Sequence, residues 1–223
     1  RRIAFSALLL YYILMSPIDI CNQALAHLGD RRITRLDDSA QASDALSRYC
    51  AEFYDQARQE VMAAHRWTFA KHVEALALRA DVLTVGYTYA HELPADHIRL
   101  LRLVPGTLIG TTTTYADTTI DSFKIVGSKV WSDETIVAAE YIRDLTNPGD
   151  WTPHFRAAVA RLLASYLAGP TADNPNEVIS QKRAYETVDL PNAQFYDAVQ
   201  DNSGENSEHS VRLAGSDLLK ARY

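Results

Sequence analysis

Residues 152–170 have the sequence TPHFRAAVARLLASYLAGP, and this stretch decides the fold that we predict for the chain. Its large side chains follow the three- and four-residue spacing of one helix face, and they are Phe155, Val159, Leu162, Leu163 and Tyr166. Gly169 and Pro170 are typical of residues that end a helix. The stretch therefore predicts a helix, and this helix follows a long segment with the composition of β-strands.

That preceding segment, residues 67–149, is rich in β-branched and aromatic side chains, which are typical of strands. Within it, residues 122–133 have the sequence SFKIVGSKVWSD, where Gly127 and Ser128 match a two-residue hairpin turn with glycine first. We therefore expect residues 67–149 to form an inserted antiparallel β domain.

Two helices are predicted before the β domain. Ser16 and Asp19 are typical of a helix start, and Gly29 is typical of a helix end. A longer helix is predicted from about Ala40 to His65, with apolar side chains at helical spacing on one face. We expect the two helices to pack on each other.

After the β domain, a further helix is predicted from near Asn174 to Val199, with an interruption at Pro191 because proline has no N–H to donate. The predicted class is α+β. A helical bundle is formed by residues 16–66 and 150–201, and the antiparallel β domain is inserted between these two parts.

The two ends of the chain differ from the predicted domains. Residues 1–15 are two arginines followed by an apolar run, which is shorter than the roughly 20 residues that span a bilayer. Two arginines before an apolar run are also typical of a secretory signal, which is the alternative. Because MSPIDI, from Met15 onward, resembles a natural protein start, we expect an upstream extension that lies outside the functional unit. Residues 202–223 are polar and predict an extended C-terminal arm. The arm has an apolar and basic tip, formed by Leu218, Leu219, Lys220, Arg222 and Tyr223.

Composition excludes some classes of protein. The net charge of -6 and the pI near 5.6 argue against tight binding to a nucleic-acid backbone, since that affinity comes from Lys and Arg. The two cysteines, Cys21 and Cys50, are too few for a disulfide framework and have no CxxC spacing. They are predicted to be buried, reduced thiols.

Residues 87–104, YTYAHELPADHIRLLRLV, hold two histidines and two carboxylates within seven residues. A zincin needs its two histidines four residues apart on a helix, whereas His91 and His97 are six apart with Pro94 between them. We predict a strand-to-strand corner set by Pro94 and Asp96, with Arg99 on the next strand. The alternative is a metal or catalytic site with a third ligand from elsewhere, for which the candidates are His65, His72 and His154.

No other chemical motif is present. The sequence has no G-x-S-x-G elbow and neither of the glycine-rich loops that bind phosphates, so we expect no catalytic residue, metal or cofactor. The arginines at positions Arg31, Arg32 and Arg35 are flanked by aspartates and predict either a self-neutralised loop or a docking loop for a partner. Trp67 and Phe69 predict core packing rather than a stacking surface.

Five segments, in order along the chain, resemble the tail tubular protein A family of short-tailed bacteriophages, which are head-to-tail connectors or adaptors. The resemblance runs from about Ser16 to the carboxyl end and is most specific in the segments 21–38, 66–69, 93–99 and 141–148, and in the helix from Pro153. The first 14 residues have no counterpart in that family.

The resemblance implies a non-enzymatic virion protein at the head-to-tail interface, assembled in the host cytoplasm. The implied partners are the portal protein, the next tail protein (nozzle or tail tube) and further copies of the chain in a twelve-subunit ring. Genomic DNA passes through the channel of such a ring without sequence-specific binding, and no membrane is involved. The tip of the arm is expected to bind the portal or a neighbouring subunit.

Two alternatives come from other classes. One is a metal-dependent virion hydrolase that uses His91 and His97. The other is a tail module that binds host glycan through Trp131 and Trp151.

Overall fold

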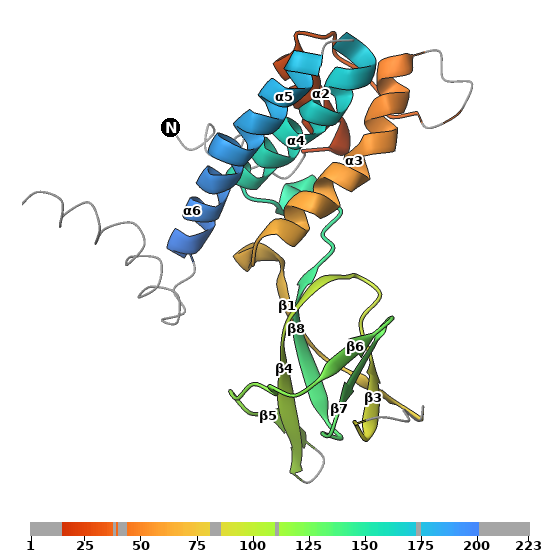
Figure 1. Cartoon of the computed structure of the whole chain (residues 1–223), viewed down its shortest axis with the longest axis vertical. Coiled ribbons are helices and arrows are strands. Elements are labelled where there is room, and N and C mark those ends of the chain that lie inside the picture. The colour runs from red at the N-terminus through yellow and green to blue at the C-terminus, as the bar shows by residue number, and fades with distance from the viewer. Residues whose placement is uncertain are drawn as a thin grey trace, which may run out of the picture. The chain divides into compact units, whose positions relative to one another are not determined.

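The computed structural model describes residues 15–37, 39, 44–80, 86–109, 112–172 and 175–200. The chain divides into two compact units, a helical unit formed by residues up to Phe69 and from Leu145 onward, and a β unit from Ala70 to Asp144 (Figure 1). The α+β class predicted from the sequence is confirmed. Residues 1–14 and 201–223, which include the predicted extension and arm, lie outside the described residues.

The first described helix, α2 (Pro17–Leu28), starts and ends where the sequence predicts. Ser16 and Asp19 form a capping box, in which the Ser16 N–H donates to Asp19 Oδ2 at 2.9 Å and the Asp19 N–H donates to Ser16 Oγ at 3.4 Å. Gly29 has a φ of 73°, a left-handed conformation that favours glycine, and it ends the helix.

The second helix, α3 (Ala45–Ala64), starts later than the predicted residue 40. The side chain of Asp44 caps it by accepting from the Leu46 N–H at 3.1 Å. Helices α2 and α3 touch each other, as predicted, but each of them packs mainly against α4 (Pro153–Ala172).

Helix α4 is the centre of the helical unit. Its residues are buried on almost all sides, which is typical of a core helix and explains why the other helices gather on it. The prediction that Gly169 and Pro170 end this helix is wrong, since it continues to Ala172. Pro170 has no N–H to donate, and this loss is tolerated because it falls in the last turn of the helix. In the same turn Thr171 Oγ1 donates to the Leu167 carbonyl at 2.8 Å.

The C-terminal helical segment consists of α5 (Pro175–Ala184), a π-helical turn η3 (Tyr185–Asp189) and α6 (Leu190–Gln200). The interruption predicted at Pro191 takes the form of this wider turn, and the chain stays helical. The Leu190 N–H donates to the Tyr185 carbonyl, five residues back. The backbone hydrogen bonds have therefore already shifted from a four-residue to a five-residue spacing just before Pro191, which has no N–H to donate.

The β unit contains two antiparallel four-stranded sheets with the orders β1-β8-β4-β5 and β2-β3-β7-β6. The strands are β1 (Lys71–Ala75), β2 (Ala77–Arg79), β3 (Tyr89–Glu92), β4 (His97–Ile109), β5 (Thr112–Tyr115), β6 (Lys124–Val126), β7 (Lys129–Ser132) and β8 (Val137–Arg143). The predicted hairpin is confirmed: β6 and β7 pair with Val126 opposite Lys129, and Gly127 in the turn has a φ of 62°.

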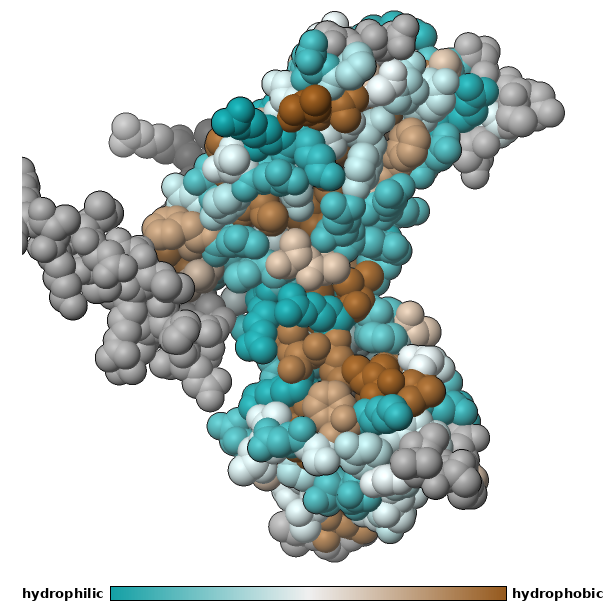
Figure 2. Space-filling model, viewed as in Figure 1, coloured by the Kyte–Doolittle hydropathy of each residue, from teal (hydrophilic) through white to brown (hydrophobic). Residues whose placement is uncertain are grey.

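Side chains from both sheets form the core of the β unit. Leu103, Val137, Ala139 and Tyr141 come from β4 and β8, and Val130 comes from β7 of the other sheet. Hydrophilic residues cover much of the visible face of both units, and hydrophobic residues on that face form separate patches (Figure 2).

The boundaries of the β unit differ from the predicted 67–149. Trp67 and Phe69 belong to the helical unit, which begins again at Leu145 and not at residue 150. The physical reason is that these aromatic rings pack with Phe155 of α4, as described below.

Candidate functional site

The predicted docking loop connects α2 to α3 and has a fixed backbone. Asn22, a buried residue of α2, donates from Nδ2 to the Ile33 carbonyl at 3.0 Å and accepts the Ile33 N–H at 2.8 Å. A buried amide that satisfies both backbone groups of one residue holds that residue in place. Ser47 Oγ on α3 donates to the Arg35 carbonyl at 2.6 Å, which fixes the far side of the loop. We call residues 29–37 the arginine loop.

The arginine loop presents all three predicted arginines to solvent. Arg31 pairs with Asp44 at 2.8 Å and Arg35 pairs with Asp37 at 3.2 Å. The pKa of Asp37 is lowered by hydrogen bonds from the side chain and backbone of Ser39, with a smaller contribution from Arg35. Arg32 forms no ion pair with another residue that the structure describes. The loop is therefore partly neutralised and keeps one cation available for an acidic partner.

A shallow pocket lies in the same unit, lined by Pro17, Leu36, Ala51, Tyr54, Asp55 and Thr146. The hydroxyl of Tyr54 is buried and has no hydrogen-bond partner among the described residues. Burial raises its pKa above the usual value. The same environment contains Cys21 and Cys50, which are free, buried thiols as predicted. We interpret this buried, protonated hydroxyl and the two buried thiols as core packing and not as a reactive site.

The predicted corner in the β unit connects β3 to β4. The His97 N–H donates to the Pro94 carbonyl at 3.2 Å, which closes the turn, and Arg99 lies on β4. Asp96 accepts from Arg143 Nε at 2.6 Å and from the Tyr141 hydroxyl at 3.2 Å. Burial alone would raise the pKa of Asp96, but these hydrogen bonds lower it overall. The polar residues of this motif thus hold the turn against β8.

The two histidines of the motif are held separately. His91 on β3 is buried, with Nε2 at 2.9 Å from the Glu134 carbonyl, and its Nδ1 has no hydrogen-bond partner among the residues that the structure describes. His97 Nδ1 lies 2.7 Å from the Pro94 carbonyl. No group of three or more His, Cys, Asp or Glu placed to hold a metal ion occurs in the described part of the chain. The other candidate ligands also have partners: His65 faces Asp197, His72 packs on Tyr141, and His154 stacks on Tyr196.

The predicted aromatic junction is a core cluster of the helical unit. Phe155 of α4 lies at its centre, with ring centroids 5.0 Å from Trp67, 5.1 Å from Phe69 and 5.2 Å from Trp151. Trp67 Nε1 donates to the Val61 carbonyl at 2.8 Å and Trp151 Nε1 donates to the Leu145 carbonyl at 3.0 Å. The alternative of a glycan-binding module relied on Trp131 and Trp151. Trp131 is 5% exposed and Trp151 is 2% exposed, so neither side chain lies on the surface of its unit.

Asp197 on α6 was missed by the sequence reasoning. It is only 2% exposed and accepts the Thr68 N–H at 3.1 Å and the Thr68 hydroxyl at 2.7 Å, while His65 Nε2 lies 3.4 Å away. It thus ties α6 to the residues that follow α3. No sequence signal identifies it, because an aspartate in a polar helix is expected on the solvent side.

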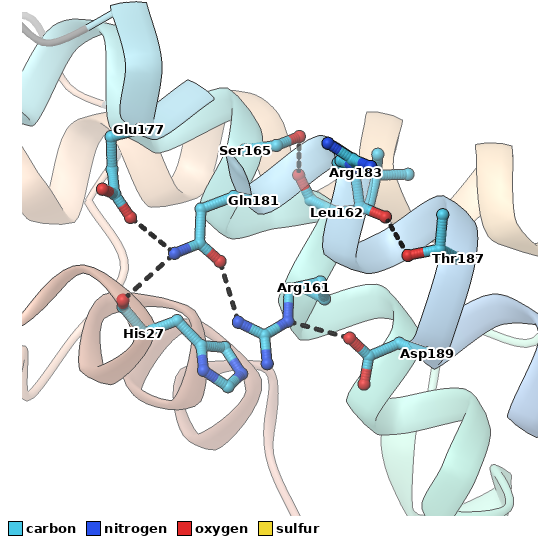
Figure 3. A network of polar contacts seen from close by, with 9 residues as sticks. All are labelled: His27, Arg161, Leu162, Ser165, Glu177, Gln181, Arg183, Thr187 and Asp189. Carbon is cyan, nitrogen blue, oxygen red and sulfur yellow. Dashed lines mark hydrogen bonds and ion pairs between the residues drawn. The ribbon is translucent and has the colours of Figure 1, made fainter. Parts of the chain in front are cut away.

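A polar network around α4 was also missed (Figure 3). Arg161 on α4 donates to Asp189 at 2.8 Å and to Gln181 Oε1 at 2.8 Å. Gln181 in turn donates to Glu177 at 2.7 Å and to the His27 carbonyl at 3.2 Å. The network connects α2, α4, α5 and the π turn.

The residues of the predicted binding arm, Leu218, Leu219, Lys220, Arg222 and Tyr223, lie outside the described residues. The described helices include none that is long and apolar enough to cross a membrane. Neither a family model nor a curated protein sequence matches the chain.

Proposed function

We propose that this chain is a structural protein of a bacteriophage virion, a head-to-tail connector that forms a ring under the portal. In this role it extends the channel through which DNA leaves the head and docks the next tail component. The observation that carries the proposal is the order of five connector-like segments along one chain, from the 21–38 block to the helix that begins at Pro153.

The architecture supports this proposal in physical terms. A unit built on one buried central helix leaves the outer faces of α3, α5 and α6 available for side-by-side packing. Head-to-tail contacts between such faces close into a ring when the rotation between subunits divides the circle. A chain with a net charge of -6 can surround DNA without gripping its phosphates.

We assign the docking of a partner to the arginine loop and to the tip of the arm. The loop has a fixed backbone, so its arginines are already placed before a partner arrives and little ordering is needed on binding. The apolar and basic tip, Leu218 to Tyr223, would bind the portal or a neighbouring subunit.

The native mass of the purified chain, alone and after mixing with portal rings from the same particle, tests the proposal. We expect the portal ring to gain the mass of twelve copies. Deletion of residues 202–223 should weaken this addition while leaving the helical unit folded. A folded portal ring that gains no mass would contradict the connector function.

A further inference from the structure

The two cysteines of the chain are neighbours across two helices. Cys21 lies on α2 and Cys50 lies on α3, and both are free thiols with 0% exposure. The side chain of Cys21 is hydrogen-bonded to Cys50, and this bond together with burial raises the pKa of the Cys21 thiol. In the reduced chain the two thiols thus pack as core side chains, with their sulfur atoms within hydrogen-bond distance of each other.

Tyr54 shows independently that Cys21 faces α3. It lies one turn after Cys50 on that helix, and its hydroxyl is buried. Burial is the main cause of the raised pKa of Tyr54, and the electrostatic interaction with Cys21 adds to it. Cys21 therefore lies against the turn of α3 that runs from Cys50 to Tyr54, where α2 and α3 are in contact.

The two cysteines enclose the arginine loop. They lie at positions 21 and 50, with residues 29–37 between them. Asn22, which holds the backbone of this loop from one side, directly follows Cys21. Ser47, which holds it from the other side, lies one turn before Cys50. A bond between the two sulfur atoms would therefore join α2 and α3 beside both residues that fix the loop.

Solvent comes near the same turns of both helices. The shallow pocket of the helical unit is lined by Pro17, one turn before Cys21 on α2, and by Ala51 and Tyr54, which follow Cys50 on α3. A local opening of the chain at this pocket would expose the thiols to a small oxidant.

We propose that Cys21 and Cys50 form a disulfide under oxidising conditions, and that this bond locks the arginine loop between α2 and α3. The bond needs only this chain and a small oxidant, so it goes beyond the proposed function. Only its occasion rests on that function. A virion protein that assembles in a reducing cytoplasm meets oxidising surroundings after release, and disulfides persist there.

The oxidant in this reaction is a low-molecular-weight disulfide. One protein thiol loses its proton and attacks a sulfur of the oxidant, which breaks the S–S bond of the oxidant and releases one small thiol. The second protein thiol then loses its proton and attacks the protein sulfur of the mixed disulfide. This step forms the bond between Cys21 and Cys50 and releases the second small thiol. Two electrons pass from the protein to the oxidant, and each small thiol takes up one proton.

A bond at this place should stabilise the helical unit. A disulfide restricts the unfolded chain, and the restriction grows with the length of the loop that it closes. By linkage, folding favours the disulfide by the same factor by which the disulfide favours folding. We expect this factor to be about 30-fold or more, provided that the folded helices hold the sulfur atoms in a suitable geometry.

Redox equilibrium of the full chain measures this factor. The chain is equilibrated in buffers with increasing ratios of reduced to oxidised glutathione, once folded and once unfolded in urea. After acid quenching, mass spectrometry gives the fraction of chains that have lost two hydrogen atoms. We expect the folded chain to keep its disulfide at ratios about 30-fold more reducing than the unfolded chain does. A folded chain that forms the disulfide no more readily than the unfolded chain would overturn the proposal.

A control variant and a local readout complete the test. Cys50→Ala leaves Cys21 without a partner and should form no disulfide within the chain. The Ile33 N–H, which donates to Asn22, should exchange its hydrogen more slowly in the oxidised chain. The Ile120 N–H, which donates to the Leu103 carbonyl in the β unit, should exchange equally in both forms. Equal exchange of the Ile33 amide in both forms would show that the disulfide does not lock the loop.

The failure of this inference can be told apart from the failure of the proposed function. Redox equilibrium uses the chain alone, whereas the function is tested by the mass that a portal ring gains. A chain that forms the disulfide and adds no mass to the portal would support the lock and contradict the function. A chain that joins the portal, although folding does not favour its disulfide, would overturn the lock and leave the function standing.

Discussion

His27 lies in the last turn of α2, close to the charged side chains of the network around α4 (Figure 3). Burial lowers its pKa below the ordinary value of 6.5, and the positive charge of Arg161 lowers it further, while Asp189 acts in the opposite direction. The neutral imidazole is thus favoured in the folded chain. Its protonation would place a second cation beside Arg161.

This shift makes a prediction about pH. A group with a lowered pKa in the folded state binds protons more readily when unfolded, so its contribution to stability is full above pH 6.5 and is lost as the pH falls below that value. The free energy of unfolding should therefore fall below pH 6.5. His27→Gln should remove that part of the pH dependence, because it keeps the backbone carbonyl that accepts from Gln181.

Denaturant unfolding of both proteins from pH 5 to pH 8 measures the difference, and other titrating groups cancel between them. Parallel stability curves for the two proteins would show that His27 has the same pKa in the folded and unfolded states.

At the scale of elements, α6 is anchored by one buried carboxylate. Asp197 accepts both the backbone N–H and the hydroxyl of Thr68 and faces His65 at the end of α3. Through these contacts the last described helix holds the residues that immediately precede the β unit.

We expect Asp197→Ala to lower the free energy of unfolding of the helical unit by about 2–3 kcal/mol, since it removes charge-assisted hydrogen bonds and leaves the Thr68 N–H without its acceptor. Asn192→Ala, on the exposed side of the same helix, should change stability by about 0.5 kcal/mol or less. The readouts are denaturant unfolding and hydrogen exchange of the Thr68 amide. Equal losses in the two variants would mean that the anchor contributes nothing specific.

The local signals in the sequence predicted the elements well where short-range chemistry decides them. Ser16 and Asp19 predicted the start of α2, and Gly127 predicted the hairpin, because capping and turn geometry depend on neighbouring residues. Gly169 and Pro170 misled, since α4 is held by packing on all sides and continues past a weak local stop. Tertiary packing overrides local propensity in such a helix.

In the candidate sites, too, features that depend on neighbouring residues could be predicted, and features that depend on distant residues could not. The exposure of the arginine loop could be predicted from its charges, whereas the clamp by Asn22 could not, since it joins two backbone groups eleven residues away. The exposure of Val188, Phe195 and Val199 was also invisible in the sequence. In the sequence these three residues resemble one face of an ordinary buried helix. The structure shows that other side chains cover α4 and that these three stay exposed.

For the molecule as a whole, the division into two units has a consequence for folding. The β unit is a single continuous stretch, Ala70 to Asp144, with its own core drawn from both sheets. The helical unit, by contrast, needs residues from both sides of that stretch. A contiguous unit with its own core can fold without the rest of the chain.

We therefore expect a fragment of residues 70–144 to fold alone, with a strand-rich circular dichroism spectrum and one cooperative unfolding transition. A domain of this size has little stability in reserve, so Leu103→Ala, which removes a fully buried side chain at a cost of about 2–5 kcal/mol, should unfold the fragment. In the full chain the same substitution should unfold the β unit and leave the helical signal in place. Loss of both signals together, or a wild-type fragment without a cooperative transition, would show that the inserted sheets depend on the helices for their fold.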